Sequence, residues 1–379
     1  MSKLKASFYN SIEAISPEHW DSIGCCDNKY YTPEFLKAFE TANSDIEFNY
    51  IIIFKDDIAV AFANTQVVTI SIETITKNIK ISDRFKQNIN NLFCNNSIRV
   101  MFCGNIFLSG EYGTFLKEGE DKLDTFNAIT KGLKTLYRST KKLNAIFIKD
   151  FKEASLYITD SLQKFDYTAM HVEPNMIITL NTEWKSFEEY KVALKSKYRV
   201  KANKADSKSD KLVAKLFSAA DIETYKDQLQ ALYENTIANA NFNAQILNLN
   251  TYTNLKATFK DAFIVKGYFL EDKLVGFLSA MVNQENLDAH FIGLDYMLNK
   301  EYAIYPRILN DYVRLGIENK STRINLGRTA SEIKSTLGAK PEKLTCYIRH
   351  KSPFQNQLMK PFMKNIQIKS FREHKPFKE

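Results

Sequence analysis

The amino-acid sequence predicts an α+β protein made of two similar domains in tandem, each a mixed sheet flanked by helices. Three observations predict this class. Residues 263–349 read as three strands followed by helix, strand, helix and strand. The first half of the chain repeats that order loosely. A length of 379 residues also gives room for two ordinary hydrophobic cores.

The stretch 263–349 carries the strongest of these signals. Phe263–Leu270 and Leu274–Met281 are apolar runs joined by three polar residues, which predicts a hairpin. Leu287–Leu294 follows as a third strand. In Tyr302–Asn319 apolar residues recur at a spacing of four, which predicts a helix with one buried face. Arg323–Leu326 then reads as a short strand.

A short capped helix is expected next. Thr329 and Glu332 have the spacing of a capping box, in which two side chains satisfy the first amides of a helix. Gly338 and then Pro341 are residues that typically end a helix. A last strand, running to Arg349, would complete the domain.

The first half shows the same order of strand, helix and strand. The corresponding strand pairs, each with a helix between them, are Ile98–Leu108 with Ala145–Lys149 and Leu287–Leu294 with Arg323–Leu326. We therefore expect an N-terminal domain over residues 1–180, with a polar insertion at about 71–97. The C-terminal domain would cover residues 181–379 and end in a basic tail.

Composition narrows the class of protein further. No run approaches 18 apolar residues and the N-terminus has no apolar signal core, so we expect a cytoplasmic protein. The five cysteines are odd in number, include the adjacent pair Cys25 and Cys26, and show no metal-ligand spacing. We expect reduced thiols and no bound metal. Phosphate-loop, nucleophile-elbow and zinc-protease motifs are all missing from the sequence.

Positive charge is concentrated just after residue 190. The segment from Lys191 to Lys215 contains nine basic and two acidic residues, which accounts for nearly the whole formal net charge of +8. Charge at this density attracts anions. The candidate substrate-binding residues, on a helix expected to begin at Ser186, are Lys197, Arg199, Lys201 and Lys204. Three of them share one helix face and Arg199 points elsewhere; a solvated, lysine-rich helix end is the alternative interpretation.

Three segments resemble a known group of proteins. HFIGLDY (His290–Tyr296), the segment Ile324–His350 and SKYRVKANKA (Ser196–Ala205) are similar to parts of tandem-domain proteins of the GNAT superfamily. This branch includes the Fem-type peptidoglycan aminoacyltransferases and the peptidoglycan-biosynthesis-like acetyltransferases. The resemblance implies two GNAT-like (acyl-CoA N-acyltransferase-like) domains. It also implies transfer of an acyl or aminoacyl group to an amine.

Such a transfer needs a base for the attacking nitrogen and donors for the tetrahedral oxyanion. The candidate catalytic residues lie on the third strand and directly after it: His290, Asp295 and Tyr296. His290 is the candidate general base, with a hydrogen-bonded core histidine as the alternative. Asp295 could instead form the turn, and Tyr296 could act as a general acid or pack as an aromatic ring.

A phosphorylated donor would need anion-binding groups. Arg328 precedes the expected capped helix, whose free amides and dipole favour an anion, and Lys334 could join it. An Arg328–Glu332 pair that braces the loop is the alternative.

The loop before the 302–319 helix departs from the GNAT pattern. Acetyl-CoA-binding members carry a glycine-rich loop there whose amides hold pyrophosphate. Here Asn299–Pro306 contains no glycine, and Pro306 has no amide proton. Either CoA is held by side chains such as Lys300, Tyr305 and Arg307, or the donor is an aminoacyl-tRNA or an acyl carrier protein.

The leading hypothesis is an acyltransferase that moves a group from a thioester or tRNA ester to an amine of a cell-envelope or lipid precursor. No tightly bound cofactor is expected; the partners would be an anionic or carrier-linked substrate together with the donor. One alternative is a nucleic-acid-binding protein that uses residues 191–215, and another is a degenerate, non-catalytic scaffold. The basic C-terminal segment Lys351–Glu379 could also contact an anionic membrane surface as an amphipathic helix.

Overall fold

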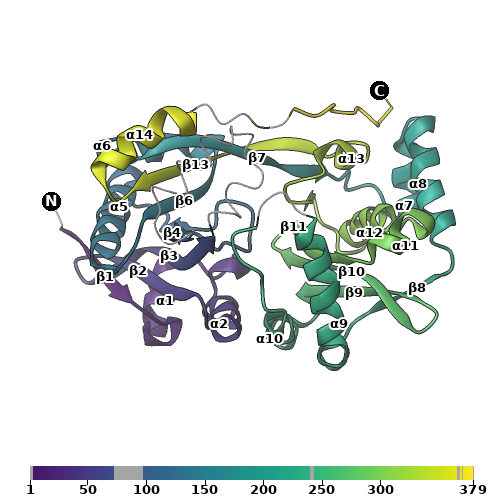
Figure 1. Ribbon diagram of the computed structural model, residues 1–379, viewed down its shortest axis with the longest axis horizontal. Coiled ribbons are helices and arrows are strands. Elements are labelled where there is room, and N and C mark those ends of the chain that lie inside the picture. Colours follow the sequence, from purple (N-terminus) through teal and green to yellow (C-terminus); the bar gives the residue numbers. More distant parts are fainter. Residues whose placement is uncertain (1–2, 72–96, 240–242, 365–367, 369, 379) are drawn as a thin grey trace. The chain divides into compact units, whose positions relative to one another are not determined.

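The computed structural model describes residues 3–71, 97–239, 243–364, 368 and 370–378. Nearly all of the insertion expected at about 71–97 therefore lies outside the described residues. The chain forms two compact α+β units (Figure 1). Unit 1 contains Met1–Val172, Asn241–Leu247 and Lys343–Ile368, and unit 2 contains Glu173–Ala240, Asn248–Glu342 and Lys369–Glu379.

Unit 1 is built on a mixed sheet. Its strands in spatial order are β1 (Leu4–Tyr9), β2 (Glu47–Lys55), β3 (Ile58–Ser71), β4 (Ser97–Cys103), β6 (Ala145–Lys152) and β13 (Lys340–His350). Neighbours run antiparallel except β4 and β6, which are parallel and connected through helix α5 (Lys122–Ser139). The short strand β5 (Thr114–Leu116) pairs with β3.

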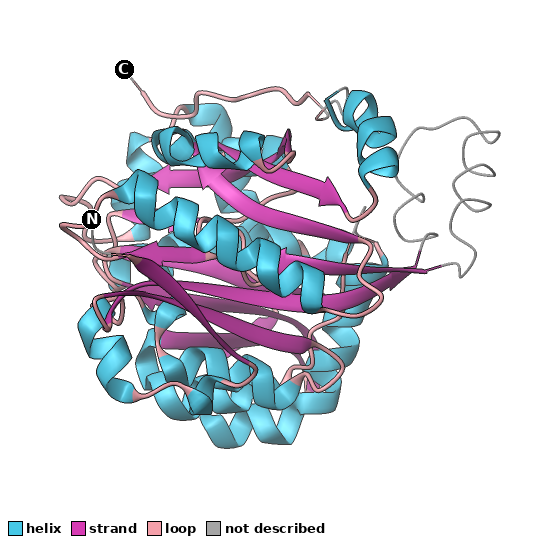
Figure 2. Ribbon diagram, turned by 90° about the vertical axis from the view of Figure 1, so that its left-hand side faces the viewer, coloured by secondary structure: helices cyan, strands magenta, loops and turns pink. Residues whose placement is uncertain are grey.

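Alternating side chains give this sheet two buried faces. On one face, Ile51 of β2 belongs to the same core cluster as Phe126 and Leu133 of α5. On the other, the ring of Phe62 on β3 lies 4.8 Å from that of Trp20 on α1 (Pro17–Ile23). Figure 2, which views the molecule from the side of unit 1, shows helices on both sides of these strands.

One helix of unit 1 begins at a clear side-chain cap. Helix α2 (Pro33–Ala42) has Thr32 as its N-cap, whose hydroxyl accepts a hydrogen bond from the Phe35 amide. In the described part of the unit, the other α-helices are α6 (Asp160–Lys164) and α14 (Pro353–Lys364).

Unit 2 repeats the arrangement. Its strands in spatial order are β7 (Thr168–Thr179), β12 (Arg323–Asn325), β11 (Asn286–Leu294), β10 (Lys273–Asn283), β9 (Phe263–Leu270) and β8 (Leu212–Leu216). Only β11 and β12 are parallel neighbours here, and they are connected through helix α12. The helices are α7 (Phe187–Ala193), α8 (Ser196–Lys208), α9 (Ala219–Ala238), α10 (Asn250–Phe259), α11 (Tyr296–Tyr302), α12 (Ile304–Glu318) and α13 (Ser331–Ser335).

Each unit takes one strand from the other half of the sequence. β13, near the end of the chain, pairs with β6 of unit 1. β7, which ends the first half, pairs with β12 of unit 2. The units therefore do not correspond to a single cut of the chain, although the repeated strand–helix–strand order is as predicted.

Two helices expected to be continuous are broken. The helix predicted from Ser186 is capped by that residue but stops at Ala193, and α8 begins at Ser196. At the break the Lys195 amide donates to the Pro376 carbonyl at 2.8 Å, so the C-terminal segment fills the interruption. The helix expected from Tyr302 begins at Ile304 instead, because Ala303 adopts a left-handed conformation with φ of 48°.

The predicted capping box at Thr329 and Glu332 is wrong. Helix α13 begins at Ser331, and its N-cap Ala330 has no side-chain hydrogen bond to offer. Thr329 and Ala330 both have positive φ, so the chain bends sharply before the helix and carries the Thr329 hydroxyl off the cap position. The Glu332 carboxylate lies 3.4 Å from Nε2 of His374 instead.

Candidate active site

The two parallel strands of unit 2 part after a short ladder. β11 pairs with β12 only from Asn286 to Asp288, opposite Arg323 to Asn325. Beyond this point the chain follows β7: the Leu326 amide donates to the Met176 carbonyl at 2.9 Å. Among the described residues, no strand continues along that edge of β11 from Ala289 to Leu294. The sheet therefore opens beside the second half of β11.

His290 lies on this parted half of β11 and belongs to a chain of hydrogen bonds. Its Nδ1 lies 2.8 Å from the hydroxyl of Tyr252 on α10. That hydroxyl lies 2.8 Å from the hydroxyl of Ser279 on β10. Ser279 in turn donates to the carbonyl of Phe291 at 2.7 Å. Groups from α10, β10 and β11 therefore hold the imidazole.

The terminal carbonyl sets the direction of every bond in this chain. A carbonyl can only accept, so the Ser279 proton points to Phe291. For the other two contacts to be hydrogen bonds as well, Ser279 accepts the Tyr252 proton. Tyr252 keeps that proton because burial raises the pKa of its hydroxyl well above the ordinary value. The Tyr252 oxygen then accepts from Nδ1–H of His290. The neutral imidazole is thus the Nδ1–H tautomer, with its lone pair on Nε2.

Asp295 is not brought to His290. It is the N-cap of α11, where Oδ1 accepts from the Met297 amide at 3.1 Å, and Oδ2 pairs with Lys273 at 2.9 Å. The hydrogen bond from Lys273 is the main reason that the pKa of Asp295 is lowered. These contacts give the carboxylate a capping role.

Tyr296, the third candidate catalytic residue, begins α11. Its side chain is 41% exposed, and the pKa of its hydroxyl is raised mainly by burial of the remainder. The hydroxyl that reaches the ring of His290 is that of Tyr252, whereas Tyr296 lies at the surface.

The start of α12 does not present amides to a pyrophosphate. The Tyr305 amide donates to Oδ1 of Asn299 at 2.8 Å. Pro306 has no N–H, and the Arg307 amide donates to the Ala303 carbonyl. Three of the first four positions of the helix are therefore unable to donate to a ligand.

The candidate cofactor-binding side chains near this helix are separated. Lys300 is exposed on α11, and its carbonyl lies 3.3 Å from Nζ of Lys208. Tyr305 is half-buried and burial raises the pKa of its hydroxyl. Arg307 points to a buried ionic cluster, where its Nε lies 3.0 Å from Oδ1 of Asp311.

That cluster is centred on the fully buried carboxylate of Asp311. Besides Arg307, its cationic partners are Lys266 at 3.0 Å and Arg314 at 2.6 Å. The hydroxyl of Tyr268 donates to the same carboxylate at 2.8 Å. Burial alone would raise the pKa of Asp311, but the three cations together lower it. Arg307 is therefore part of the fold's internal charge balance.

Lys334 and Arg328 meet in one loop. Lys334 is buried, and its ammonium donates to the carbonyls of Leu326, Gly327 and Arg328 at 2.7, 3.3 and 2.5 Å. Burial lowers the pKa of Lys334 to about 7, against an opposing effect of Glu173. The lysine thus holds the backbone of the loop that leaves β12. The side chain of Arg328 is half-buried in the same loop.

The basic residues of α8 form a separate surface. Lys197, Lys201 and Lys204 are exposed on one side of the helix, while Arg199 is half-buried. The acidic side chain on the helix, Asp206, pairs with Arg314 at 2.5 Å and so does not neutralise these lysines. Sequence spacing predicted this shared face. These lysines lie on α8 and Arg328 lies in the loop after β12, whereas Nδ1 of His290 contacts Tyr252 on α10, which in turn contacts Ser279 on β10.

Sequence reasoning missed the two residues that orient His290. Tyr252 and Ser279 lie on different elements and are 27 residues apart. Nothing in their local pattern marks them, because both are ordinary buried positions of α10 and β10. Only the folding of α10 against the sheet brings them together.

We also searched the described residues for metal-ligand clusters and membrane-spanning helices. No group of three or more potential metal ligands occurs among the described residues. In the same part of the chain, no helix is long and apolar enough to cross a membrane.

Comparison with solved structures identifies the fold. The chain has the fold of tandem GNAT proteins: mixed strands of one long sheet span two GNAT-like halves, with helices on the sheet faces. A crystal structure of FemX matches 94% of this chain and 100% of that chain, with a TM-score of 0.56 and 10% identity. L-PGS from Bacillus licheniformis and a tandem GNAT protein of the clavulanic acid pathway match at a TM-score of 0.49, with 12% and 6% identity. They cover 88% and 93% of this chain, and 96% and 99% of their own chains.

No protein-family model matches the sequence, and no curated protein matches it. The likeness in structure therefore defines a fold, and the activity has to be argued from the site.

Proposed function

We propose that the protein is an acyltransferase that moves an acyl or aminoacyl group to an amine acceptor, in a ternary complex without a covalent enzyme intermediate. The observation that carries this proposal is the oriented imidazole of His290 beside the parting of β11 and β12. An opened sheet offers backbone groups to an extended donor, and a histidine with its lone pair on Nε2 can accept a proton.

The chemistry follows from these positions. The lone pair of Nε2 would take a proton from the attacking amine, and the imidazolium that forms would stay hydrogen-bonded to Tyr252 through Nδ1. Backbone amides along the parted edge of β11 would donate to the oxyanion of the tetrahedral intermediate. Collapse of the intermediate breaks the C–O or C–S bond of the donor. The departing hydroxyl of the tRNA or thiol of the carrier takes the proton back from the imidazolium, and the acyl group remains on nitrogen.

The donor is proposed to be an aminoacyl-tRNA or an acyl carrier protein. The start of α12 lacks the amides that a CoA pyrophosphate needs, since Tyr305, Pro306 and Arg307 cannot donate there. The exposed lysines of α8 supply positive charge for a phosphate-rich carrier instead. We propose that the acceptor is an amine of a cell-envelope or lipid precursor. We also propose that the protein acts in the cytoplasm, where such donors are made.

A transfer assay tests the proposal. The purified chain is given acetyl-CoA, a loaded acyl carrier protein or a mixed pool of charged tRNA, with amine-bearing envelope precursors as acceptors. We expect transfer from the tRNA or carrier donor only. Saturable transfer from acetyl-CoA would contradict the donor assignment and leave the acyltransferase assignment intact.

The basic face of α8 also supports a second candidate function, binding of nucleic acid without transfer. Asp206 is engaged by Arg314, so the local positive charge is not neutralised from within the helix. RNA binding that weakens with salt, combined with no turnover from any donor, would favour this candidate. The same absence of turnover without RNA binding would favour a non-catalytic scaffold.

A further inference from the structure

We propose that the surface of unit 1 around α14 docks on an anionic lipid bilayer. The helix turns apolar side chains outward: Phe354 is 72% exposed and Leu358 is 58% exposed. They are four positions apart and so share one helix face, with the exposed Pro361 one turn further along. The opposite face is the anchored one, since Asn356 is buried and donates to the Asp166 carboxylate at 2.7 Å.

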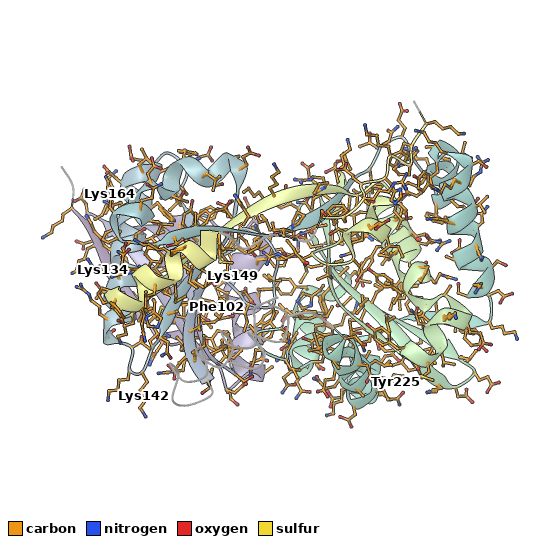
Figure 3. The ribbon with its side chains drawn as sticks, turned by 45° about the horizontal axis from the view of Figure 1, so that its top comes forward. Phe102, Lys134, Lys142, Lys149, Lys164 and Tyr225 are labelled. Atoms are coloured by element: carbon orange, nitrogen blue, oxygen red, sulfur yellow. The ribbon has the colours of Figure 1, made fainter. Side chains whose placement is uncertain are left out.

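The surroundings of this apolar face are positively charged. The end of α5 and the turn after it carry five basic and no acidic residues: Lys131, Lys134, Arg138, Lys141 and Lys142. All but the half-buried Lys134 are exposed. In the view of Figure 3, Lys164 lies above α14 (yellow) and Lys142 lies below it, with Lys134 between them. Acidic residues in the neighbouring α6 region are Asp160 and Asp166, and Asp166 is paired with Lys360.

Side-chain contacts place this charge along the helix. Just before α14, Lys351 donates through Nζ to the Thr140 carbonyl at 3.2 Å, next to Lys141 and Lys142. Further along the helix, Lys360 holds Asp166, and the adjacent Phe165 ring lies 5.0 Å from Nζ of Lys134. Basic groups therefore flank both ends of the apolar face.

The pattern fits a membrane better than another protein surface. An amphipathic helix that exposes Phe and Leu between lysines lies flat in the headgroup region, with its rings in the acyl boundary and its cations on anionic phosphates. A peripheral contact of this kind would bring the chain to lipid-linked acceptors, although the inference does not depend on the proposed transferase activity.

Vesicle flotation of the full-length protein tests the inference. We expect flotation with phosphatidylcholine–phosphatidylglycerol vesicles and not with phosphatidylcholine alone. Raising the salt from about 0.1 M to about 1 M, which shortens the Debye length from about 10 Å to about 3 Å, should weaken binding strongly.

Two variants separate the apolar and ionic parts. The double variant Phe354→Ser/Leu358→Ser should lower the partition coefficient at least about tenfold, because the apolar side chains no longer enter the bilayer. Lys141→Gln/Lys142→Gln/Lys164→Gln should lower it roughly fivefold per lysine. Thermal unfolding should not change, since these side chains are at the surface.

Matched controls lie in unit 2. Val213→Ser/Leu216→Ser on β8 removes two apolar side chains of similar exposure, 65% and 60%. Lys197→Gln/Lys201→Gln/Lys204→Gln on α8 removes the same charge. Both controls should keep vesicle binding. The inference is overturned if wild type does not float, or if the controls lose as much binding as the α14 variants. It is also overturned if the wild type sediments as a dimer that Phe354→Ser/Leu358→Ser dissociates, since the face would then contact a second copy.

Discussion

Nδ1 of His290 lies 2.8 Å from the hydroxyl of Tyr252, and the proton of that hydroxyl is directed to Ser279. The tyrosine therefore acts on the imidazole as an acceptor. A neutral tyrosine in this place does what a carboxylate does beside many catalytic histidines: it fixes the tautomer and the ring orientation. It does so without adding a full negative charge, so it stabilises the imidazolium less.

Tyr252→Phe should change the tautomer of His290. Without the acceptor, the preference for Nδ1–H disappears, and nitrogen chemical shifts of His290 should move toward the Nε2–H form. The transfer rate should fall roughly tenfold, because only the fraction with a lone pair on Nε2 can act as base. Stability should fall by roughly 1–3 kcal/mol, because the two hydrogen bonds of the buried hydroxyl are removed.

A matched control for this variant is Tyr312→Phe. The Tyr312 hydroxyl is also buried and donates to the backbone carbonyl of Ser279 at 3.0 Å, outside the chain that reaches His290. It should cost about 1 kcal/mol, for the hydrogen bond to Ser279, and leave the His290 spectrum unchanged. Equal tautomer shifts in both variants would show that general loosening of the core, not the Tyr252 contact, controls the ring.

His290→Gln and Asp295→Asn should behave differently. Loss of a general base lowers the rate by roughly 10²–10⁴-fold, so His290→Gln should abolish most transfer with little change in donor binding. Asp295→Asn should keep the α11 cap, since Asn caps a helix as well as Asp does, and should lose only the pair with the exposed Lys273, at a cost of about 0.2–1 kcal/mol.

The pH dependence of Asp295 provides a further check. The pKa of Asp295 is lowered in the folded protein, so its stabilisation is present at neutral pH and is lost as pH falls through the folded pKa. The stability of Asp295→Asn should therefore converge on that of wild type in acid. A rate loss in Asp295→Asn as large as that in His290→Gln would instead make Asp295 part of the chemistry.

Lys334→Met should change how stability depends on pH. The pKa of Lys334 is about 7 in the folded protein, below its ordinary 10.5, so between these values the unfolded chain binds more protons than the folded one. Stability contributed by this group then rises with pH, by up to about 1.4 kcal/mol per unit. Urea unfolding at several pH values between 7 and 10 should show this slope in wild type and its loss in Lys334→Met.

The same substitution leaves the carbonyls of Leu326 and Arg328 without the ammonium. We expect the free energy of unfolding to fall by about 2 kcal/mol at pH 7. The carbonyls left without a hydrogen-bond partner cost more than is gained by no longer burying the lysine charge. A slope that persists in Lys334→Met would assign the titration to another group.

Lys197→Gln/Lys201→Gln/Lys204→Gln should weaken binding of charged tRNA. Removal of one lysine–phosphate pair lowers the slope of log affinity against log salt by roughly 0.7 to 0.9, so the slope of the triple variant should fall by about two to three. Filter binding across a salt series measures this. The unit 1 variant Lys141→Gln/Lys142→Gln/Lys164→Gln removes equal charge and should keep the wild-type slope; an equal fall there would indicate diffuse attraction by net charge.

Local sequence predicted a large part of this fold. The strands at residues 263–294 and the helix that becomes α12 follow from short-range periodicity, which survives in any tertiary setting. The helix start at Ser186 was predicted for the same reason, since a cap involves residues three apart. The capping box wrongly predicted at Thr329 shows the limit of local sequence patterns. The spacing of Thr329 and Glu332 is present, but two residues in the left-handed conformation redirect the chain.

The sequence alone therefore determined the class of fold, the repeated strand–helix–strand order and the basic face of α8, because each depends on neighbours along the chain. Tertiary structure alone decided the exchange of β7 and β13 between units, the engagement of Arg307 with Asp311, and the tautomer of His290. These depend on atoms that are distant in sequence and meet only after the sheet has formed. The direction of the hydrogen bond between His290 and Tyr252 follows from the bond that Ser279 donates to the Phe291 carbonyl.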